Sequence, residues 1–387
     1  MNVPERGFTQ MEFEQRTLRA QRMMRDQCLD ALLLTTEPNV RYFSGFYSQF
    51  WHSPTRPWFL VVPLEGKPIA VIPEIGQSGM AATWLDDIRT WPAPRPEDDG
   101  VSLLGNVIRE RQRFGRIGVT LGHESTLRMP AADFRRLRKL LQPVEIVDCT
   151  MLIRSLRNLK SLEEIAKMRH ICRLTSDAFE VLPERLRTGE TERENCRRFR
   201  IDLLERGVDD SPYLISGSGP GGYDSIIMGP SDRVLQEGDV MIIDTGSTFE
   251  GYFSDFDRNF AFGRADSELC EAYRTVYAAT EAGLASARPG ATMADLWQAM
   301  WAVLEAGGAL GNDVGRMGHG LGMQLTEGPS VTPFDTTVLQ PGMVITLEPG
   351  MTFAPGKQMV HEENLLITNA GAELLSRRAP AEIPVVV

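Results

Sequence analysis

The sequence predicts a two-domain α/β (α+β) protein, and three observations support this fold class. The chain has 387 residues, more than one small hydrophobic core usually holds. Helix-like and strand-like segments alternate over roughly the first 150 residues. In the remainder, strands joined by hairpin turns lie between long amphipathic helices, which is typical of an antiparallel or mixed sheet with helices on one side.

The first domain is expected to span residues 1–155. Its elements follow from apolar runs, their spacing and the turn residues between them. In chain order we expect a helix over 12–27, a strand over 31–36, a hairpin of strands 59–63 and 68–73, a strand near 116–120, a basic helix over 134–141 and a strand near 144–148.

The second domain is expected to span residues 156–387. Ser161 and Glu164 form a capping-box pattern, after which apolar residues continue at helical spacing. At least four long helices are predicted, including one that stops before Pro289. The other assigned segments are helices over 267–287 and 292–306 and strands over 239–246, 251–262, 343–351 and 363–368.

Composition narrows the classes of partner. The formal net charge is −11, which argues against nucleic acid or an anionic membrane as the main partner. No run of about 18 apolar residues predicts a membrane span, and the charged first ten residues do not form a secretory signal. The five cysteines are widely spaced and form no CxxC pair, so we expect reduced thiols in a cytoplasmic protein.

Five side chains in the C-terminal part of the sequence suit a pair of divalent metal ions. Each lies in a short segment marked by glycine or proline. Two ions would bring four positive charges, which four carboxylates would balance. Without metal the carboxylates would repel one another and take up protons. The five residues are Asp244, Asp255, His319, Glu348 and Glu362.

The local sequence explains how these side chains could converge. Asp244 ends an apolar run, and Asp255 follows the turn at Glu250-Gly251, so a hairpin can bring both carboxylates side by side. Two metals about 3.5–4 Å apart can activate a water and polarise a substrate oxygen. The glycines around His319 allow a backbone to pass close to a bulky site.

The last two acids end or enter strands. Glu348 follows an apolar strand and precedes Pro349-Gly350. Glu362 stands beside Glu363, and neighbouring residues on a strand point to opposite faces, so one of the two can face the metals.

These segments resemble metallopeptidase family M24, whose members include aminopeptidase P, prolidase, methionine aminopeptidase and creatinase. The stretch IDTGSTFEGYFSDFDRNF is similar to the family's Asp-Asp hairpin. GHGLG, TLEPGM and EENLLIT are similar to its His, Glu and Glu segments, in the same order. The linker LKSLEEIAKMRHI resembles the start of the catalytic domain in the prolidase and creatinase branch. The spacing from Glu362 to Thr368 selects Glu362 over Glu363.

The resemblance implies a creatinase/prolidase-like N-terminal domain and a pita-bread catalytic domain with a curved antiparallel sheet. It also implies two divalent metal ions (Mn, Co, Fe or Zn), a short-peptide or small-molecule substrate and a homodimer. The sequence departs from the family where auxiliary histidines are usual. The position four before His319 is Gly315, the position seven after it is Thr326, and residues 225–228 contain no histidine.

Other residues must replace those imidazoles, which hold substrate and move protons. Asp257 shares the strand face of Asp255 and would extend the acidic site. Arg258 would hold a substrate carboxylate or, alternatively, form a structural salt bridge. Further substrate-binding candidates are Tyr223, Asp224 and Thr326, and Glu327 is a candidate outer acid.

An aromatic segment in the first domain offers two more candidates, Trp51 and His52. Residues 42–59 contain eight aromatic side chains. They would cage a methylated cation at the active site of a partner subunit or, alternatively, pack as core and dimer interface. His361 is expected to point away from the metals, because Glu362 points toward them.

Three functions follow from these patterns. The first is a dinuclear-metal hydrolase that cleaves an amide or related C–N bond, with Glu348 as proton shuttle, acting as an Xaa-Pro aminopeptidase or dipeptidase. The second is a non-peptidase hydrolase or lyase for a small zwitterionic osmolyte. The third is a catalytically silent binding protein, against which four costly buried carboxylates argue.

Overall fold

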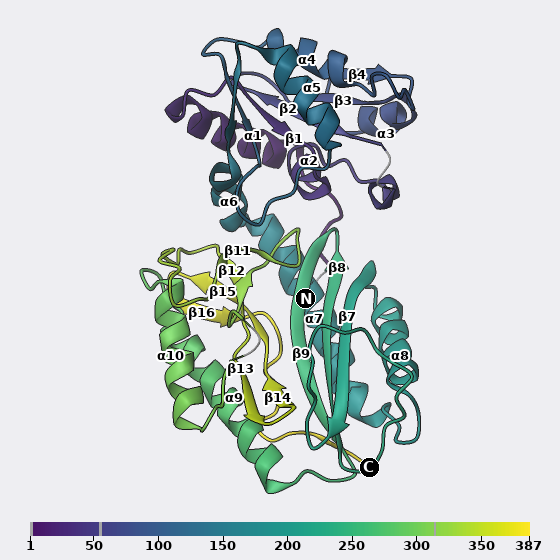
Figure 1. Cartoon of the computed structure of the whole chain (residues 1–387), viewed down its shortest axis with the longest axis vertical. Helices are drawn as coiled ribbons and strands as arrows, with labels where there is room; N and C mark the ends of the chain where they lie inside the picture. Colours follow the sequence, from purple (N-terminus) through teal and green to yellow (C-terminus); the bar gives the residue numbers. More distant parts are fainter. Residues whose placement is uncertain (1–2, 54–55, 313–314) are drawn as a thin grey trace. The chain divides into compact units, whose positions relative to one another are not determined.

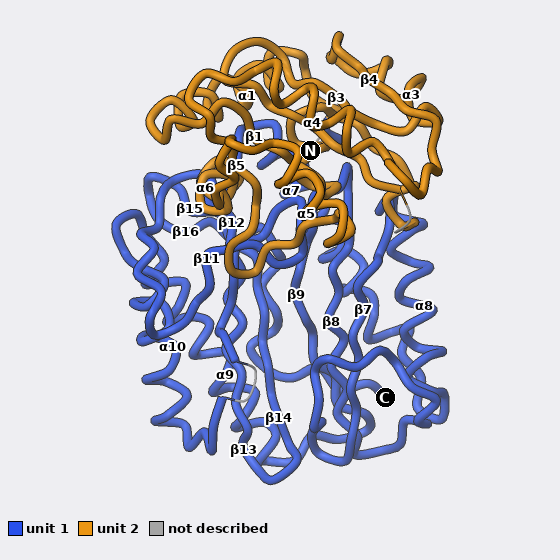
Figure 2. Tube along the Cα trace, turned by 45° about the horizontal axis from the view of Figure 1, so that its top comes forward, with its two compact units in different colours: residues 1–4, 158–387 blue, residues 5–157 orange. Residues whose placement is uncertain are grey.

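A computed structural model describes residues 3–53, 56–312 and 315–387. The chain divides into two compact units (Figure 2), one spanning Glu5–Arg157 and the other Asn158–Val387 together with the short segment up to Pro4. The sequence placed a domain boundary after residue 155. That these units are separate folding domains remains a prediction.

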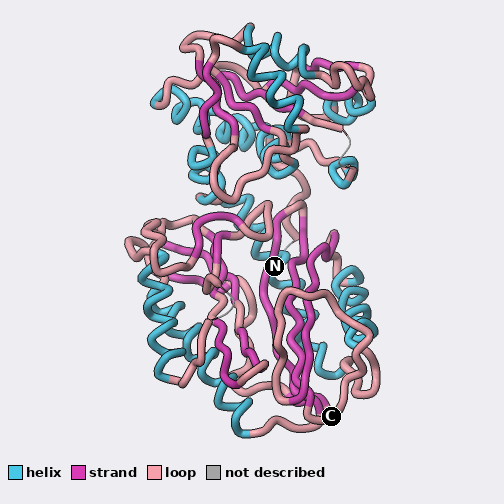
Figure 3. Tube along the Cα trace, in the orientation of Figure 1, coloured by secondary structure: helices cyan, strands magenta, loops and turns pink. Residues whose placement is uncertain are grey.

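The unit Glu5–Arg157 is built on a six-stranded mixed sheet with the order β4-β3-β2-β1-β5-β6. β1 pairs antiparallel with β2 and parallel with β5, and the expected hairpin at 59–73 is confirmed by the antiparallel pairing of β2 with β3. Figure 3 shows these strands with their helices. The strands are β1 Ala31–Leu34, β2 Phe59–Pro63, β3 Ile69–Pro73, β4 Ile88–Trp91, β5 Arg116–Val119 and β6 Glu145–Asp148. The helices are α1 Gln10–Asp26, α2 Glu37–Ser44, α3 Gln77–Ala81, α4 Val101–Arg109, α5 Ala131–Leu141 and α6 Thr150–Asn158.

The unit Asn158–Val387 contains a four-stranded sheet, a five-stranded sheet and a two-stranded ribbon. The four-stranded sheet has the order β17-β9-β8-β7, in which β7, β8 and β9 are antiparallel neighbours and β17 is parallel to β9. Its strands are β7 Asp210–Pro220, β8 Asp239–Phe249, β9 Tyr252–Phe262 and β17 Val385–Val386.

The five-stranded sheet has the order β11-β10-β12-β15-β16, and all of its neighbours are antiparallel. Its strands are β10 His319–Gly320, β11 Glu327–Ser330, β12 Val344–Leu347, β15 Glu363–Thr368 and β16 Gly371–Leu374, and the ribbon pairs β13 Gly350–Ala354 with β14 Lys357–Val360. Strand β15 also contacts β9, so the two sheets meet beside the hairpin β8–β9.

Four long helices cover these sheets, as the sequence predicted. α7 (Leu162–Val181) and α8 (Glu192–Glu205) contact β7, β8 and β9, whereas α9 (Ser267–Ser286) packs on α10 (Met293–Ala306) and on β12, β13 and β14. Figure 1 shows α8 beside β7 and the pair α9 and α10 beside the strands drawn in yellow. The predicted capping box of Ser161 and Glu164 is present at the start of α7.

Two sequence expectations can be compared with this fold directly. Within residues 3–53, 56–312 and 315–387, no helix combines the length and the apolar character that a membrane span requires. All five cysteines lie in the described ranges and are free thiols, and three of them (Cys149, Cys172 and Cys196) are buried.

Candidate metal centre

The hairpin β8–β9 places three carboxylates on one face of the sheet. Its turn, Glu250-Gly251, has positive φ at both residues (54° and 76°), as two-residue hairpin turns of strongly twisted strands require. The resulting register sets Asp244 opposite Asp257 and Asp255 opposite Gly246. Because alternate residues of a strand share a face, the three carboxylates project together.

The glycines on either side of His319 let neighbouring backbone segments pack directly against this part of the chain. A Cβ on Gly318 would lie 2.2 Å from the carbonyl oxygen of Thr346, and one on Gly320 would lie 2.4 Å from that of Gly328. Nδ1 of His319 lies 3.0 Å from the carbonyl oxygen of Gly320. A proton on Nδ1 would satisfy this contact and leave the lone pair of Nε2 for a metal ion.

Three of the five predicted ligands meet at metal-ligand spacing. One ligating atom from each of Asp255, His319 and Glu362 lies within 4.8 Å of the other two, and all three residues are buried. Nε2 of His319 is 3.5 Å from Oδ2 of Asp255. These atoms come from β9, β10 and the junction between β14 and β15.

Asp244 and Glu348, the other two predicted ligands, are half-buried, and their charges act on both Asp255 and Glu362. Burial is the main cause that raises the pKa of Asp244 to about 7 and that of Glu348 to about 8. Burial, reinforced by the other carboxylates, also raises the pKa values of Asp255 and Glu362 well above the ordinary range. Repulsion among these carboxylates is consistent with the predicted site.

The donor set fits divalent cations. Three buried carboxylate oxygens, Asp244 Oδ1, Asp257 Oδ1 and Glu362 Oε1, have no hydrogen-bond partner. Buried anionic oxygens are costly unless they are paired or coordinate a metal. Carboxylate oxygens with one imidazole nitrogen are ligands that Mn, Fe, Co and Zn accept.

Comparison with known proteins agrees with this geometry. The model of metallopeptidase family M24 matches residues 166–369, which is more than half of the chain. The chain belongs to metallopeptidase family M24. The model of the Creatinase/Prolidase N-terminal domain matches residues 16–159. The protein is therefore an M24-type enzyme, a metal-dependent hydrolase with the fold of the pita-bread prolidases, as the sequence predicted.

Relatives are similar over nearly the whole length. A probable dipeptidase PepE from Mycobacterium tuberculosis is 28% identical over 373 residues, 93% of each chain. An uncharacterized peptidase, YqhT, from Bacillus subtilis is 26% identical over 92% of this chain and 95% of its own. Among solved structures, dipeptidase PepE from Mycobacterium ulcerans has a TM-score of 0.86 at 28% identity over 98% of this chain and 99% of its own. A prolidase from Thermococcus sibiricus has a TM-score of 0.87 at 23% identity over 97% of this chain and all of its own, which shows the shared fold.

Tyr213 is a site residue of this M24 enzyme that sequence reasoning missed. It lies in β7 opposite Gly246, and its side chain hydrogen-bonds the Asp244 carboxylate. Burial, and next the charge of Asp244, raise the pKa of the Tyr213 hydroxyl far above its usual range, so it stays a hydrogen-bond donor. No motif marks this tyrosine, since only the pairing of β7 with β8 brings it to the site.

Arg316 is a second residue that the sequence did not indicate. Its positive charge partly opposes the rise in the pKa of Glu348, which burial mainly causes. Its Nη1 donates to the Ser330 hydroxyl over 2.9 Å. The arginine stands beside Gly315, where the family usually has a histidine, and it supplies positive charge near that position.

Arg258 turns away from the carboxylate cluster. Its guanidinium pairs with Glu363 at 3.1 Å and donates to the main-chain carbonyls of Glu362 and Asp257. It also stacks over the ring of Phe256. These contacts favour the structural salt bridge over the substrate-holding role that the sequence also allowed.

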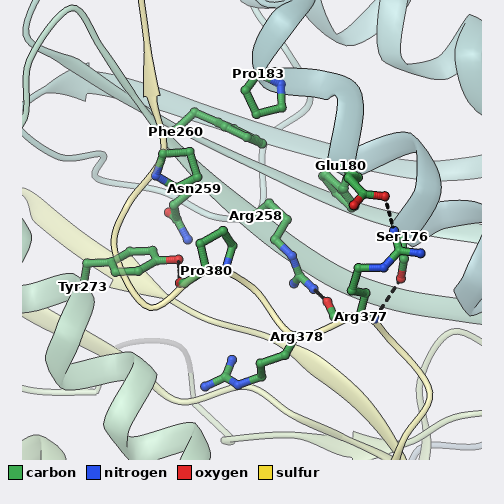
Figure 4. Close-up of a pocket in the computed structure, with 12 residues that line it drawn as sticks. Ser176, Glu180, Pro183, Arg258, Asn259, Phe260, Tyr273, Arg377, Arg378 and Pro380 are labelled. Carbon is green, nitrogen blue, oxygen red and sulfur yellow. Dashed lines mark hydrogen bonds and ion pairs between the residues drawn. The ribbon is translucent and has the colours of Figure 1, made fainter.

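Arg258 instead lines a cavity of about 190 Å³ formed by α7, β9, α9 and the C-terminal segment (Figure 4). Arg377 and Arg378 also face this cavity. Arg377 is bound by Asp177 and Glu180, and Arg378 by Glu363 and Glu281. None of the five predicted metal ligands is among the residues that line this cavity.

The predicted substrate-binding residues of this unit differ in how exposed they are to solvent. Tyr223 is buried, donates to Asn259 over 2.8 Å and accepts from the Val360 amide, so its hydroxyl anchors β9 to β14. Asp224 is exposed and Thr326 half-buried.

Two neighbouring groups have structural partners. Glu327, the candidate outer acid, accepts from the Gln324 amide and lies 3.8 Å from the Lys160 ammonium. His361 packs edge-on against Tyr273 and Tyr277, neither of which is a predicted metal ligand.

Trp51 and His52 belong to the other compact unit. Trp51 is buried beside Trp58, with the Arg128 guanidinium over its ring, whereas His52 is exposed. Of the eight aromatic residues at 42–59, only Tyr47 and Phe50 are exposed, and each has an arginine of its own unit over its ring. This arrangement favours packing over a cage for a methylated cation.

Proposed function

We propose that this M24 enzyme holds two divalent ions and cleaves the amide bond of a dipeptide or short peptide, as an Xaa-Pro aminopeptidase or dipeptidase does. The observation that carries the proposal is the meeting of Asp255, His319 and Glu362 at metal-ligand spacing. Relatives named as a probable dipeptidase and as prolidases support a short peptide as the substrate class.

Asp244, Asp255, His319, Glu348 and Glu362 would hold the ions, with manganese the first candidate because four of the five donors are carboxylates. When bound, the ions would activate a water and polarise the scissile carbonyl. The chain supplies the remaining functions. The side chain of Tyr213 fixes the orientation of Asp244, and the Nδ1 contact of His319 fixes its ring.

Glu348 is the proposed proton carrier. It stands at the end of β12, and its amide donates to the Met317 carbonyl over 2.9 Å, so its backbone is held in place. Its half-buried carboxylate can meet both a water and a leaving amine. Against the rise that burial causes, the positive charge of Arg316 lowers the pKa of this carboxyl group and so favours its ionised form.

A second candidate is a non-peptidase hydrolase or lyase acting on a small zwitterion. The auxiliary histidines of the family are replaced by Gly315 and Thr326 and are absent from residues 225–228. Among their neighbours, Tyr223 and Glu327 are already held by other groups. A peptide would therefore meet fewer side-chain donors here than in an enzyme that keeps the histidines.

The quaternary and cellular setting is also proposed. We expect a homodimer in the cytoplasm with reduced cysteines, in which the exposed His52 of one subunit serves the site of the other, whereas Trp51 packs within its own unit. Size-exclusion chromatography with light scattering would test the dimer. A His52→Ala variant that retains the wild-type KM would show that His52 does not contact the substrate.

A substrate panel distinguishes the candidate functions. The purified protein is loaded with Mn or Co and offered Xaa-Pro dipeptides, other dipeptides and small zwitterions, with His319→Ala as the matched inactive control. Release of proline or another amino acid supports the peptidase. Turnover of zwitterions alone supports the second candidate, and no turnover of any compound, with tight capture of a partner, supports a silent binding protein.

A further inference from the structure

Asp257 is a buried carboxylate beyond the five expected ligands. The residue is 1% exposed, and its Oδ1 has no hydrogen-bond partner. The carboxylate does accept a hydrogen bond from the backbone amide of Glu362, which lies at the entrance to β15. One oxygen is therefore held in place while the other remains unsatisfied.

The unsatisfied oxygen belongs to a group of three. Asp257 lies directly opposite Asp244 in the β8–β9 register, where Cβ atoms of opposing residues are about 4.5–5.5 Å apart. Asp244 Oδ1 and Glu362 Oε1 also lack partners, although both are buried. The main chain of Glu362 donates to the Asp257 carboxylate, so Asp257 lies beside both Asp244 and the segment that carries Glu362.

Arg258, the neighbouring cation on β9, does not neutralise this group by contact. Its guanidinium donates to the main-chain carbonyl of Asp257 rather than to the carboxylate, and its ion pair is with Glu363. A buried carboxylate without a contacting cation or a full set of donors is strongly unfavourable. Three such oxygens on segments that are paired or hydrogen-bonded to one another match the ligand requirement of a hard, oxygen-preferring cation.

We propose that Asp257 is a further metal ligand, acting with Asp244 and Glu362 on the ion nearest the hairpin, while His319 and Asp255 serve the other ion. This inference rests on the two-metal centre of the proposed function. It makes the hairpin-side position an all-oxygen site, which favours Mn, Fe or Mg over Zn, whereas the imidazole position also suits Zn.

The test compares metal binding by wild-type protein, Asp257→Asn and Asp202→Asn. Asp202 is a buried carboxylate of α8 paired with Arg185 and Arg206, and it is the control for loss of a buried charge elsewhere. Mn²⁺ is titrated calorimetrically into each metal-free protein, and bound metal is counted by elemental analysis. Loss of an outer partner of a ligand costs roughly 10- to 100-fold in affinity.

For a direct ligand we expect Asp257→Asn to weaken one Mn²⁺ site by at least about 100-fold and to change the other by less than about threefold. Asp202→Asn should keep both sites. Unchanged affinities in Asp257→Asn, or an equal loss at both sites, would overturn the inference, as would a similar loss in Asp202→Asn.

A thermal measurement gives a second readout that a structural role would not reproduce. Metal-free Asp257→Asn should melt above metal-free wild type, because a buried uncompensated charge is removed. With Mn²⁺ the order should reverse, because the wild type gains more from binding. An equal difference in both states would show a role independent of metal and would also overturn the inference.

The outcomes for the wild type separate this inference from the proposed function. If wild type binds two Mn²⁺ ions and hydrolyses peptides while Asp257→Asn does the same with equal affinity, only the role of Asp257 fails. If wild type binds two ions without cleaving any peptide, the peptidase proposal fails. The role of Asp257 as a ligand is then still tested by comparing the Mn²⁺ affinities of wild type and Asp257→Asn. If wild type binds no metal, both proposals fail.

Discussion

The Asp244→Asn substitution should stabilise the metal-free enzyme and destabilise the metal-loaded one. The folded protein raises the pKa of Asp244 from 3.8 to about 7, mainly through burial. A carboxyl whose folded pKa is raised contributes its full stability below the unfolded pKa, and this contribution is lost as pH rises through the folded pKa. Asparagine does not ionise, so the variant avoids that loss.

The magnitude follows from the size of the pKa change. A rise from 3.8 to about 7 corresponds to about 4 kcal/mol, at about 1.4 kcal/mol for each pH unit. Asp244 is half-buried and shares protons with neighbouring carboxylates, so we expect about 2–4 kcal/mol at pH 7.5. Near pH 4 the two metal-free proteins should differ little in charge-dependent stability.

Equilibrium urea unfolding of both chelator-treated proteins between pH 4.5 and 7.5 measures this difference. His361, whose pKa burial lowers well below its usual value, titrates with the opposite effect on stability, but it is present in both chains and cancels. Excess Mn²⁺ at 1,000 times its dissociation constant would add about 4.1 kcal/mol for each intact site, which exceeds the metal-free difference, so the sign should reverse.

Two results would refute this reasoning. A metal-free difference that stays constant from pH 4.5 to 7.5 would mean that Asp244 ionises as easily in the folded chain as in the unfolded one. An Asp244→Asn protein that gains as much stability from Mn²⁺ as wild type would mean that this carboxylate does not hold metal.

Three other substitutions test separate parts of the site. His319→Ala should lower bound metal from about two ions per chain and abolish turnover, since its Nε2 belongs to the ligand group; elemental analysis showing full occupancy would contradict this. Glu348→Gln should reduce kcat by about 10²–10⁴ in metal-loaded enzyme, and wild-type rates of peptide release would remove its role as proton carrier. Arg258→Met should cost about 3–5 kcal/mol of unfolding free energy, because it leaves Glu363 with one cation fewer in a buried site, without raising KM. A raised KM at unchanged stability would restore the substrate-holding role of Arg258.

Much of the fold and the centre of the site could be predicted from local sequence. The Glu250-Gly251 turn between apolar strands predicts the β8–β9 hairpin, and period-two alternation then places Asp255 and Asp257 on one face. The capping box at Ser161 predicts the start of α7 because capping is a contact within one helical turn.

The remainder depends on contacts between distant segments. Strand β7 was not predicted, since its glycines and serines weaken the strand pattern, and Tyr213 could not be placed without it. Strand β10 has only two residues, so its pairing with β11 and β12 leaves no periodic signal. The direction of the Arg258 side chain was ambiguous because Glu363, its partner, lies on β15.

The most direct test is an anomalous difference map at the manganese absorption edge from crystals grown with Mn²⁺. We expect two peaks about 3.5–4 Å apart. The peaks should lie among the side chains of Asp255, His319 and Glu362, with Nε2 of His319 close to one of them. No peak at these side chains from crystals of fully loaded protein, or a peak bound only elsewhere on the chain, would contradict the account.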